Sequence, residues 1–209
     1  MRAARQRRIR RLLTEIEQAN EARFLAAPFP LYGLPPSITA PRWIASSGYR
    51  SDRAGYATNP EAGLQLELSY GDPTDLLPSL LRVATAASAG ESPERLAPLR
   101  RLLWQEVVAD RLAAPSRRWK FGWFKAPDEQ GIGGSPQLLP ILVDGQPHQF
   151  ALLQEGVVQV ARVELAGQVV TVRARRWPIQ TVQLIQVTDL APYLDGRRQL
   201  IARLLTAPN

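Results

Sequence analysis

The second half of the chain consists of short apolar segments separated by turn sequences. Three glycine-containing pairs, Asp144-Gly145, Glu155-Gly156 and Ala166-Gly167, follow one another at intervals of about eleven residues. This spacing is typical of an antiparallel meander of hairpins. The pattern predicts strands over residues 138–143, 148–154, 157–165, 168–176 and 181–187.

The fourth of these strands has two different faces. Apolar and polar residues alternate along it, with Val170, Val172 and Ala174 on one face and Thr171, Arg173 and Arg175 on the other. Because the apolar face of a sheet needs a cover, a further element must pack on it. The apolar stripe of a helix over about residues 190–205, with Asp189 as its N-cap, fits this role.

The middle of the chain predicts two more strands and one helix. Residues 64–69 alternate like a half-buried strand and end at the Gly71-Asp72-Pro73 turn. Residues 79–87 fit a strand or a short helix, and we favour the strand. Ser92-Pro93 resembles a helix start, and a helical stripe continues from there to about Ala113. The predicted class is therefore α+β, with a single α+β domain over residues 63–209.

Two further regions precede this domain. Residues 1–26 predict a basic amphipathic helix, because its apolar side chains recur at helical spacing, at Ile9, Leu12, Leu13, Ile16 and Phe24. Residues 27–62 are rich in proline, glycine and aromatic residues, which excludes a helix or a long strand. A simple linker would be polar, so we expect an ordered loop that packs across the domain surface.

Composition and charge narrow the function classes. The 209 residues are 45% hydrophobic, which suits a globular fold, and 26 Lys+Arg against 19 Asp+Glu give a net charge of +7. The absence of cysteine excludes disulfides, thiolate nucleophiles and cysteine-ligated metals. With no apolar run long enough to span a bilayer and no secretory signal in the first thirty residues, we expect a cytoplasmic protein.

The positive charge is concentrated at the N-terminus. Six of the seven excess charges come from the basic helix, at Arg2, Arg5, Arg7, Arg8, Arg10 and Arg11. Glu15, Glu17 and Glu21 follow on the same helix, and neighbours such as Arg11 and Glu15 balance part of this charge. The helix can dock on the protein's own core or on a partner, contact nucleic acid or another acidic surface, or lie on a membrane. We favour docking, because any surface helix needs an apolar stripe.

Candidate catalytic chemistry is sparse. His148 is the only histidine and no Gly-x-Ser-x-Gly motif accompanies it, so we interpret it as a surface or turn residue. Asp72 and Asp75 are the most plausible oxygen ligands for a metal, but their sequence also fits an ordinary turn, which we favour. The Gly131, Gly133 and Gly134 cluster lacks the rest of a dinucleotide fingerprint. We expect no catalytic residue, no cofactor and no metal.

An aromatic and basic segment near residue 120 is the most unusual part of the domain. In an extended conformation Trp119, Phe121 and Trp123 share one face, which fits a half-buried strand or a stacking platform for single-stranded nucleic acid. We favour the strand. The candidate contacts to nucleic acid or an acidic partner are the six N-terminal arginines together with Arg118, Trp119, Lys120, Trp123 and Lys125.

These observations predict a non-catalytic cytoplasmic interaction or structural protein that docks a partner or itself through the N-terminal helix. One alternative is a protein that binds nucleic acid without sequence specificity, through the N-terminal arginines and the Trp119 to Lys125 strand. A second alternative is an enzyme with a carboxylate-based site that the sequence does not reveal.

Overall fold

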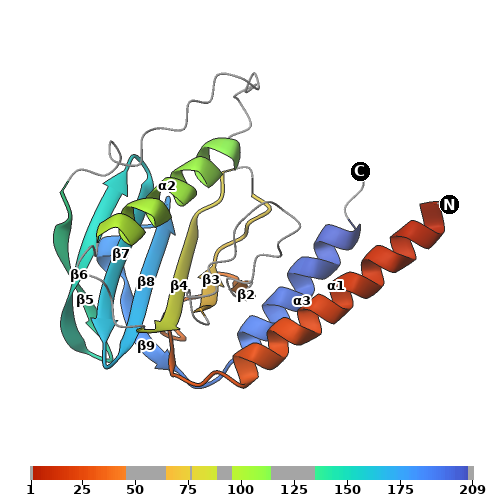
Figure 1. Ribbon diagram of the computed structural model, residues 1–209, viewed down its shortest axis with the longest axis horizontal. Coiled ribbons are helices and arrows are strands. Elements are labelled where there is room, and N and C mark those ends of the chain that lie inside the picture. Colours follow the sequence, from red (N-terminus) through yellow and green to blue (C-terminus); the bar gives the residue numbers. More distant parts are fainter. Residues whose placement is uncertain (1, 46–64, 76, 89–95, 114–134, 207–209) are drawn as a thin grey trace.

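A computed structural model describes residues 2–45, 65–75, 77–88, 96–113 and 135–206. These residues form three helices and a curled sheet of nine strands (Figure 1). The helices are α1 (Arg2–Leu25), α2 (Leu96–Ala113) and α3 (Ala191–Thr206). The strands are β1 (Leu31–Gly33), β2 (Arg42–Ala45), β3 (Gln65–Tyr70), β4 (Leu80–Ala87), β5 (Gln137–Val143), β6 (Gln146–Glu155), β7 (Val158–Leu165), β8 (Gln168–Arg175) and β9 (Gln183–Val187).

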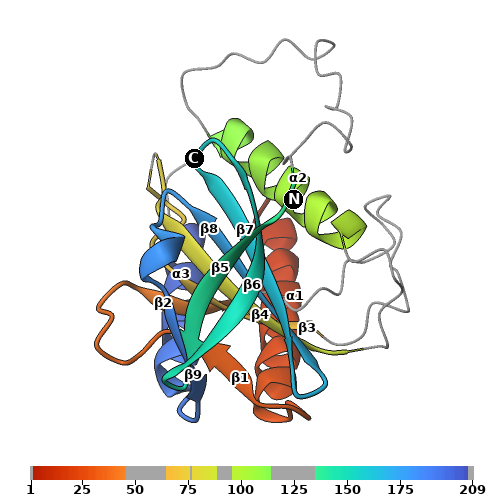
Figure 2. The ribbon, with the colours of Figure 1, turned by 90° about the vertical axis from the view of Figure 1, so that its left-hand side faces the viewer.

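The sheet has the strand order β1-β9-β5-β6-β7-β8-β4-β3-β2. Only β5 and β9 pair in parallel, and all other neighbours are antiparallel. The sheet curls so that the β1 edge reaches β3 and β4 (Figure 2). The Tyr32 N–H donates to Thr85 Oγ1 at 3.4 Å, and the Leu34 N–H donates to the Tyr70 hydroxyl at 2.6 Å. The concave face is thereby closed into a core.

The core is filled by alternate residues of the strands. Leu68, Val83, Phe150 and Val172 all point into it and are buried. The apolar face of β8 is therefore covered mainly by the opposite strands of the same sheet. The predicted α+β class is confirmed, and the last helix packs on the sheet, although at its β2 edge and not over the meander. The α3 helix packs against β2, whereas α2 lies on the outer face of β6, β7 and β8.

The hairpin turns confirm the glycine-based prediction. Asp144 and Gly145 have φ values of 49° and 80°, and Ala166 and Gly167 have 47° and 76°. Two consecutive positive φ values are the mark of the type I′ turn, whose twist matches that of paired strands. The expected strands agree with β5 to β9 to within two residues at each end. The fifth begins later than expected because a 3₁₀ turn at Ile179–Thr181 (η3) precedes β9.

The remaining elements also follow the sequence pattern. The strand preference for residues 79–87 is confirmed by β4, and the helix that ends near Ala113 is α2. The expected start of that helix, at Ser92, lies outside the described residues. Residues 27–45 contain only the short strands β1 and β2, and their apolar side chains pack on the core, for example Leu31, Leu34 and Ile44. Residues 46–62 of the predicted loop lie outside the described residues. Among the helices of the described chain, none is long and apolar enough to cross a membrane.

Candidate interaction surface

The α1 helix is anchored to the body of the protein at its C-terminal end. Phe24 is 1% exposed and belongs to the core, and Asn20, one turn earlier, is also buried. Further along the helix toward the N-terminus, Arg11 is far more exposed, at 82% of its side-chain surface. The helix is 24 residues long, so at a rise of about 1.5 Å per residue it measures roughly 36 Å. Among the described side chains of α1, the buried ones lie in its last two turns.

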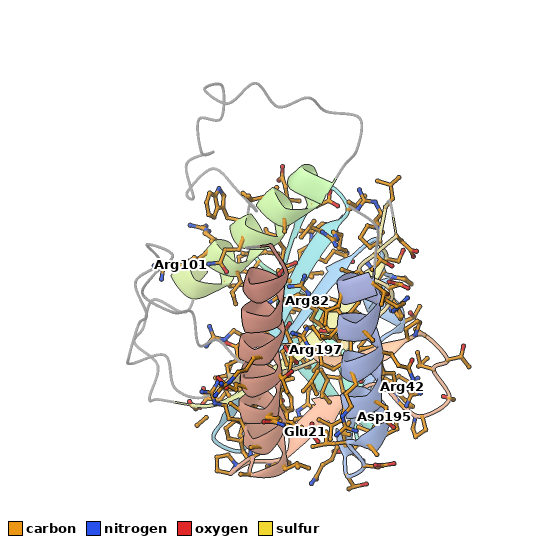
Figure 3. All side chains as sticks on the ribbon, turned by 90° about the vertical axis from the view of Figure 1, so that its right-hand side faces the viewer. Glu21, Arg42, Arg82, Arg101, Asp195 and Arg197 are labelled. Atoms are coloured by element: carbon orange, nitrogen blue, oxygen red, sulfur yellow. The ribbon has the colours of Figure 1, made fainter. Side chains whose placement is uncertain are left out.

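The middle of α1 is joined to α3 by ion pairs. The two helices run side by side in opposite directions (Figure 1, Figure 3). Arg197 donates two hydrogen bonds of 2.8 Å to the carboxylate of Glu17. One turn away, Arg198 pairs with Glu21 and also with Asp195, the latter at 2.9 Å. Long polar side chains therefore bridge the two helices.

A groove of about 450 Å³ lies between α1 and α3. Its floor is apolar and comes from β2 and α3, through Ile44, Leu194, Ile201 and Leu205. The α1 side carries Thr14, Gln18 and Glu21, which recur at helical spacing and share one face. The paired residues Glu17, Glu21, Arg197 and Arg198 also line the groove, and Leu205 is its most exposed large apolar side chain, at 39%. This groove is the candidate interaction surface.

The ion pairs change the charge balance that the sequence suggested. Arg11 pairs with Glu15 at 2.9 Å, as predicted. Glu17 and Glu21 pair with Arg197 and Arg198 of α3. Residues 2–16 contain six arginines and one glutamate, which gives 6 − 1 = +5. The N-terminal half of α1 is therefore strongly basic by its formal charge.

Only some of the predicted site residues lie in the described part of the chain. Arg2, Arg5, Arg7, Arg8 and Arg10 belong to α1, but their side chains are not among those described. Arg118, Trp119, Lys120, Trp123 and Lys125 lie outside the described residues, and so do Gly131, Gly133 and Gly134. The expectation that a strand over 119–125 contributes to a binding surface stays a prediction.

The start of α3 is held rigidly against the sheet. The hydroxyls of Tyr193 and Tyr70 are 2.6 Å apart, and their rings meet edge to face. Burial raises the pKa of both tyrosines. At Gly196 the helix approaches the β2 backbone so closely that a Cβ would clash with the carbonyl oxygen of Arg42. The α3 helix is thus a fixed support, against which α1 is the less firmly attached partner.

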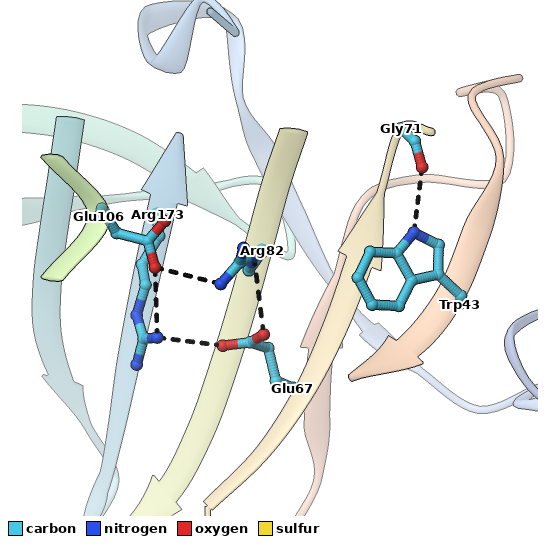
Figure 4. Close-up of polar contacts among 6 residues, drawn as sticks. All are labelled: Trp43, Glu67, Gly71, Arg82, Glu106 and Arg173. Carbon is cyan, nitrogen blue, oxygen red and sulfur yellow. Dashed lines mark hydrogen bonds and ion pairs between the residues drawn. The ribbon is translucent and has the colours of Figure 1, made fainter. Parts of the chain in front are cut away.

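A second arginine–carboxylate cluster lies between α2 and the sheet, where the sequence predicted only a polar strand face. Arg82 of β4 and Arg173 of β8 are opposite one another in register, with Glu67 of β3 and Glu106 of α2 between them. Figure 4 shows the closed ring: Arg82 and Glu106 are 3.1 Å apart, and Arg173 and Glu67 are 3.4 Å apart. Both glutamates are more than nine-tenths buried. Neighbouring Arg175 is also buried, and this burial lowers the pKa of its guanidinium.

The candidate catalytic residues are not brought together. His148 is partly buried on β6, opposite Ile141 of β5. Asp72 forms the predicted turn, where it accepts hydrogen bonds from the hydroxyl and the N–H of Thr74 at 2.6 and 2.9 Å. These bonds, with a smaller contribution from Arg203, lower the pKa of Asp72 to about 2. The described residues contain no cluster of three His, Cys, Asp or Glu side chains suited to a metal ion.

Comparisons of the chain with protein-family models, with curated proteins and with solved structures gave no match.

Proposed function

We propose that the protein is a cytoplasmic interaction protein whose α1–α3 helix pair binds a protein partner. The observation that carries this proposal is the division of α1 into an anchored half and a basic half. Phe24 and the Glu17–Arg197 pair hold the anchored half against the body of the protein. The basic half, residues 2–16, has a formal charge of +5. An amphipathic helix beside an apolar groove is a recurring means of protein recognition. The expected partner surface combines apolar residues with carboxylates.

Site-specific crosslinking tests this proposal. A photo-reactive residue is placed at position 9 of α1 and, as the control, at position 142 of β5, which is exposed on another face. We expect crosslinking to a defined protein from position 9 only. The captured protein is then purified, and its affinity is measured for the full chain and for an Arg7→Glu, Arg10→Glu variant. A drop of roughly tenfold or more supports the proposal. Equal crosslinking from both positions, or an unchanged affinity, overturns it.

The formal charge of +5 over residues 2–16 also favours a second candidate, in which the arginines bind nucleic acid. Glu17 and Glu21, the next carboxylates along the helix, pair with α3. If all six arginines contacted phosphates, the logarithm of the affinity for duplex DNA would fall against the logarithm of salt concentration with a slope near about −5. Fluorescence anisotropy with a labelled duplex and a labelled single strand measures this. Absence of binding at 50 mM salt removes the candidate.

A further inference from the structure

We propose that Arg175, at the end of β8 and beneath α2, binds a small inorganic anion, at a site separate from the α1–α3 helix pair. This arginine is buried without a close partner. Its side chain is 7% exposed, and its Nε has no hydrogen-bond partner among the described residues. Its ion pair with Asp110 of α2 is long, with Nε and Oδ1 4.0 Å apart. Buried cations are normally paired and hydrogen-bonded, because an unpartnered buried charge is costly.

Asp110 does not neutralise Arg175 alone, because the same carboxylate oxygen also binds Arg176. The Oδ1 atom of Asp110 accepts a hydrogen bond from Nη1 of Arg176. The Asp110 side chain is 14% exposed, so solvent ions screen these charges only weakly. One carboxylate therefore faces two guanidinium groups, and the nearer of them is that of Arg176. The more distant one, that of Arg175, needs a further anionic partner.

The adjacent ring of side chains in Figure 4 does not supply this partner. It consists of two arginines and two glutamates, which balance one another: Glu67, Arg82, Glu106 and Arg173. With the three side chains above, the described cluster holds four arginines and three carboxylates, which gives 4 − 3 = +1. Burial is the largest cause of the lowered pKa of Arg175, and the charge of Arg82 is the next. The surroundings of Arg175 are therefore short of negative charge.

The site favours a small anion. Arg173 lies two residues earlier on the same face of β8, and its Nε is also buried without a hydrogen-bond partner among the described residues, so a second donor lies on this face. The planar guanidinium fork suits the oxygens of phosphate or sulfate, and chloride is a smaller anion that arginine can also pair with. With 7% of the Arg175 side chain exposed, a bulky organic acid has little access to it. The ligand class is therefore a small inorganic anion.

Thermal unfolding of the full chain tests this site, with gluconate as a bulky reference anion. Chloride, sulfate or phosphate replaces gluconate stepwise at constant ionic strength. We expect at least one of them to raise Tm along a saturating curve, by about 3 °C or more at ten times its dissociation constant. Arg175→Gln should lose this rise. The matched control Arg101→Gln makes the same change at an exposed arginine of α2 and should keep it.

The order of stability gives a second measurement. In gluconate alone, Arg175→Gln should unfold at the same temperature as the unmodified chain or above it, because it removes an uncompensated buried charge. The inorganic anion should reverse this order, and titration calorimetry should find the affinity roughly tenfold or more weaker in the variant. If Arg175→Gln does not fold, Arg175→Lys keeps the charge without the planar fork and should weaken binding in the same assay. Rises in Tm that do not saturate, or that are equal in the unmodified chain and the Arg175 variant, overturn the site.

Discussion

The contact between α2 and the sheet and the contact between α1 and α3 both use arginine–carboxylate pairs, but their surroundings differ. Beside the ring of Glu67, Arg82, Glu106 and Arg173, α2 also buries an apolar cluster that includes Leu103 and Val160. Between α1 and α3 the paired side chains line a groove and keep between 19% and 59% of their surface exposed. Buried pairs are costly to break, because removal of one partner leaves a desolvated charge, whereas exposed pairs contribute little. The same chemistry therefore makes a permanent contact in one place and a separable one in the other.

The largest expected effect follows from removal of a charge in the buried ring. Glu106→Gln keeps the shape of the side chain but leaves Arg82 and Arg173 with one carboxylate between them. We expect a loss of about 3 kcal/mol in the free energy of unfolding, measured by urea denaturation. Glu15→Gln makes the same chemical change at an exposed pair and should cost no more than about 0.5 kcal/mol. Similar losses in the two variants would remove the distinction between the two contacts.

The support of α3 against the sheet gives the second effect. In an exposed helix, Gly→Ala stabilises by about 0.5–1 kcal/mol. At Gly196 the new Cβ would clash with the Arg42 carbonyl oxygen, so Gly196→Ala should instead destabilise by about 2 kcal/mol, measured by thermal and urea unfolding. Gln199→Ala, on an exposed face of α3, should stay within about 0.5 kcal/mol. A stabilised Gly196→Ala protein would show that α3 is not tightly packed on β2.

Loss of the Glu17–Arg197 ion pair should have a smaller effect on the free energy of unfolding, and this effect should depend on salt. Glu17→Gln removes the charge that holds Arg197 and should cost about 0.5–1 kcal/mol at 50 mM salt, with most of the difference lost at 500 mM. The loss should appear as faster amide hydrogen exchange in the middle of α1, while exchange in α2 is unchanged. If the variant leaves amide exchange unchanged in α1 as well as in α2, α1 is held by something other than this pair.

The smallest effect is the pH dependence at Asp72, which connects the turn after β3 to Arg203 near the end of α3. The pKa of Asp72 in the folded protein, about 2, is below its value of 3.8 in the unfolded chain. Its carboxylate therefore stabilises the fold fully above about pH 4, and the contribution is lost as the pH falls from there toward 2. Asp72→Asn should flatten this part of the stability–pH curve and leave the region above pH 5 parallel to that of the unmodified chain. An unchanged curve between pH 2 and 4 would contradict the assignment.

Features that depend on neighbouring residues were predictable from the sequence. The type I′ turns require two adjacent residues with positive φ, and Asp144-Gly145 supplies them locally. The pair of Arg11 and Glu15 depends only on helical spacing and is confirmed. The extent of α1 and the strands of the meander follow from their apolar period for the same reason.

Features that depend on pairing between distant segments were not predictable. The sequence places Arg173 on a polar strand face, because nothing near it indicates that α2 covers that face with Glu106. Its position opposite Arg82 depends on the register between β4 and β8, some ninety residues apart. The pairing of Glu17 with Arg197 likewise needs the curled sheet to bring α1 and α3 together. Even the alternation of Arg173 and Arg175 with Val172 and Ala174 cannot indicate which helix lies above.

The distance along the chain between Glu17 and Arg197 has a consequence for synthesis. The two residues are 180 positions apart, so Glu17 is made well before its ion-pair partner. At about 5–20 residues per second, the ribosome needs roughly 10–40 s to cover that distance. During this interval Glu17 and Glu21 cannot yet pair with Arg197 and Arg198. A molecule that binds the nascent helix can therefore occupy these carboxylates before α3 is made.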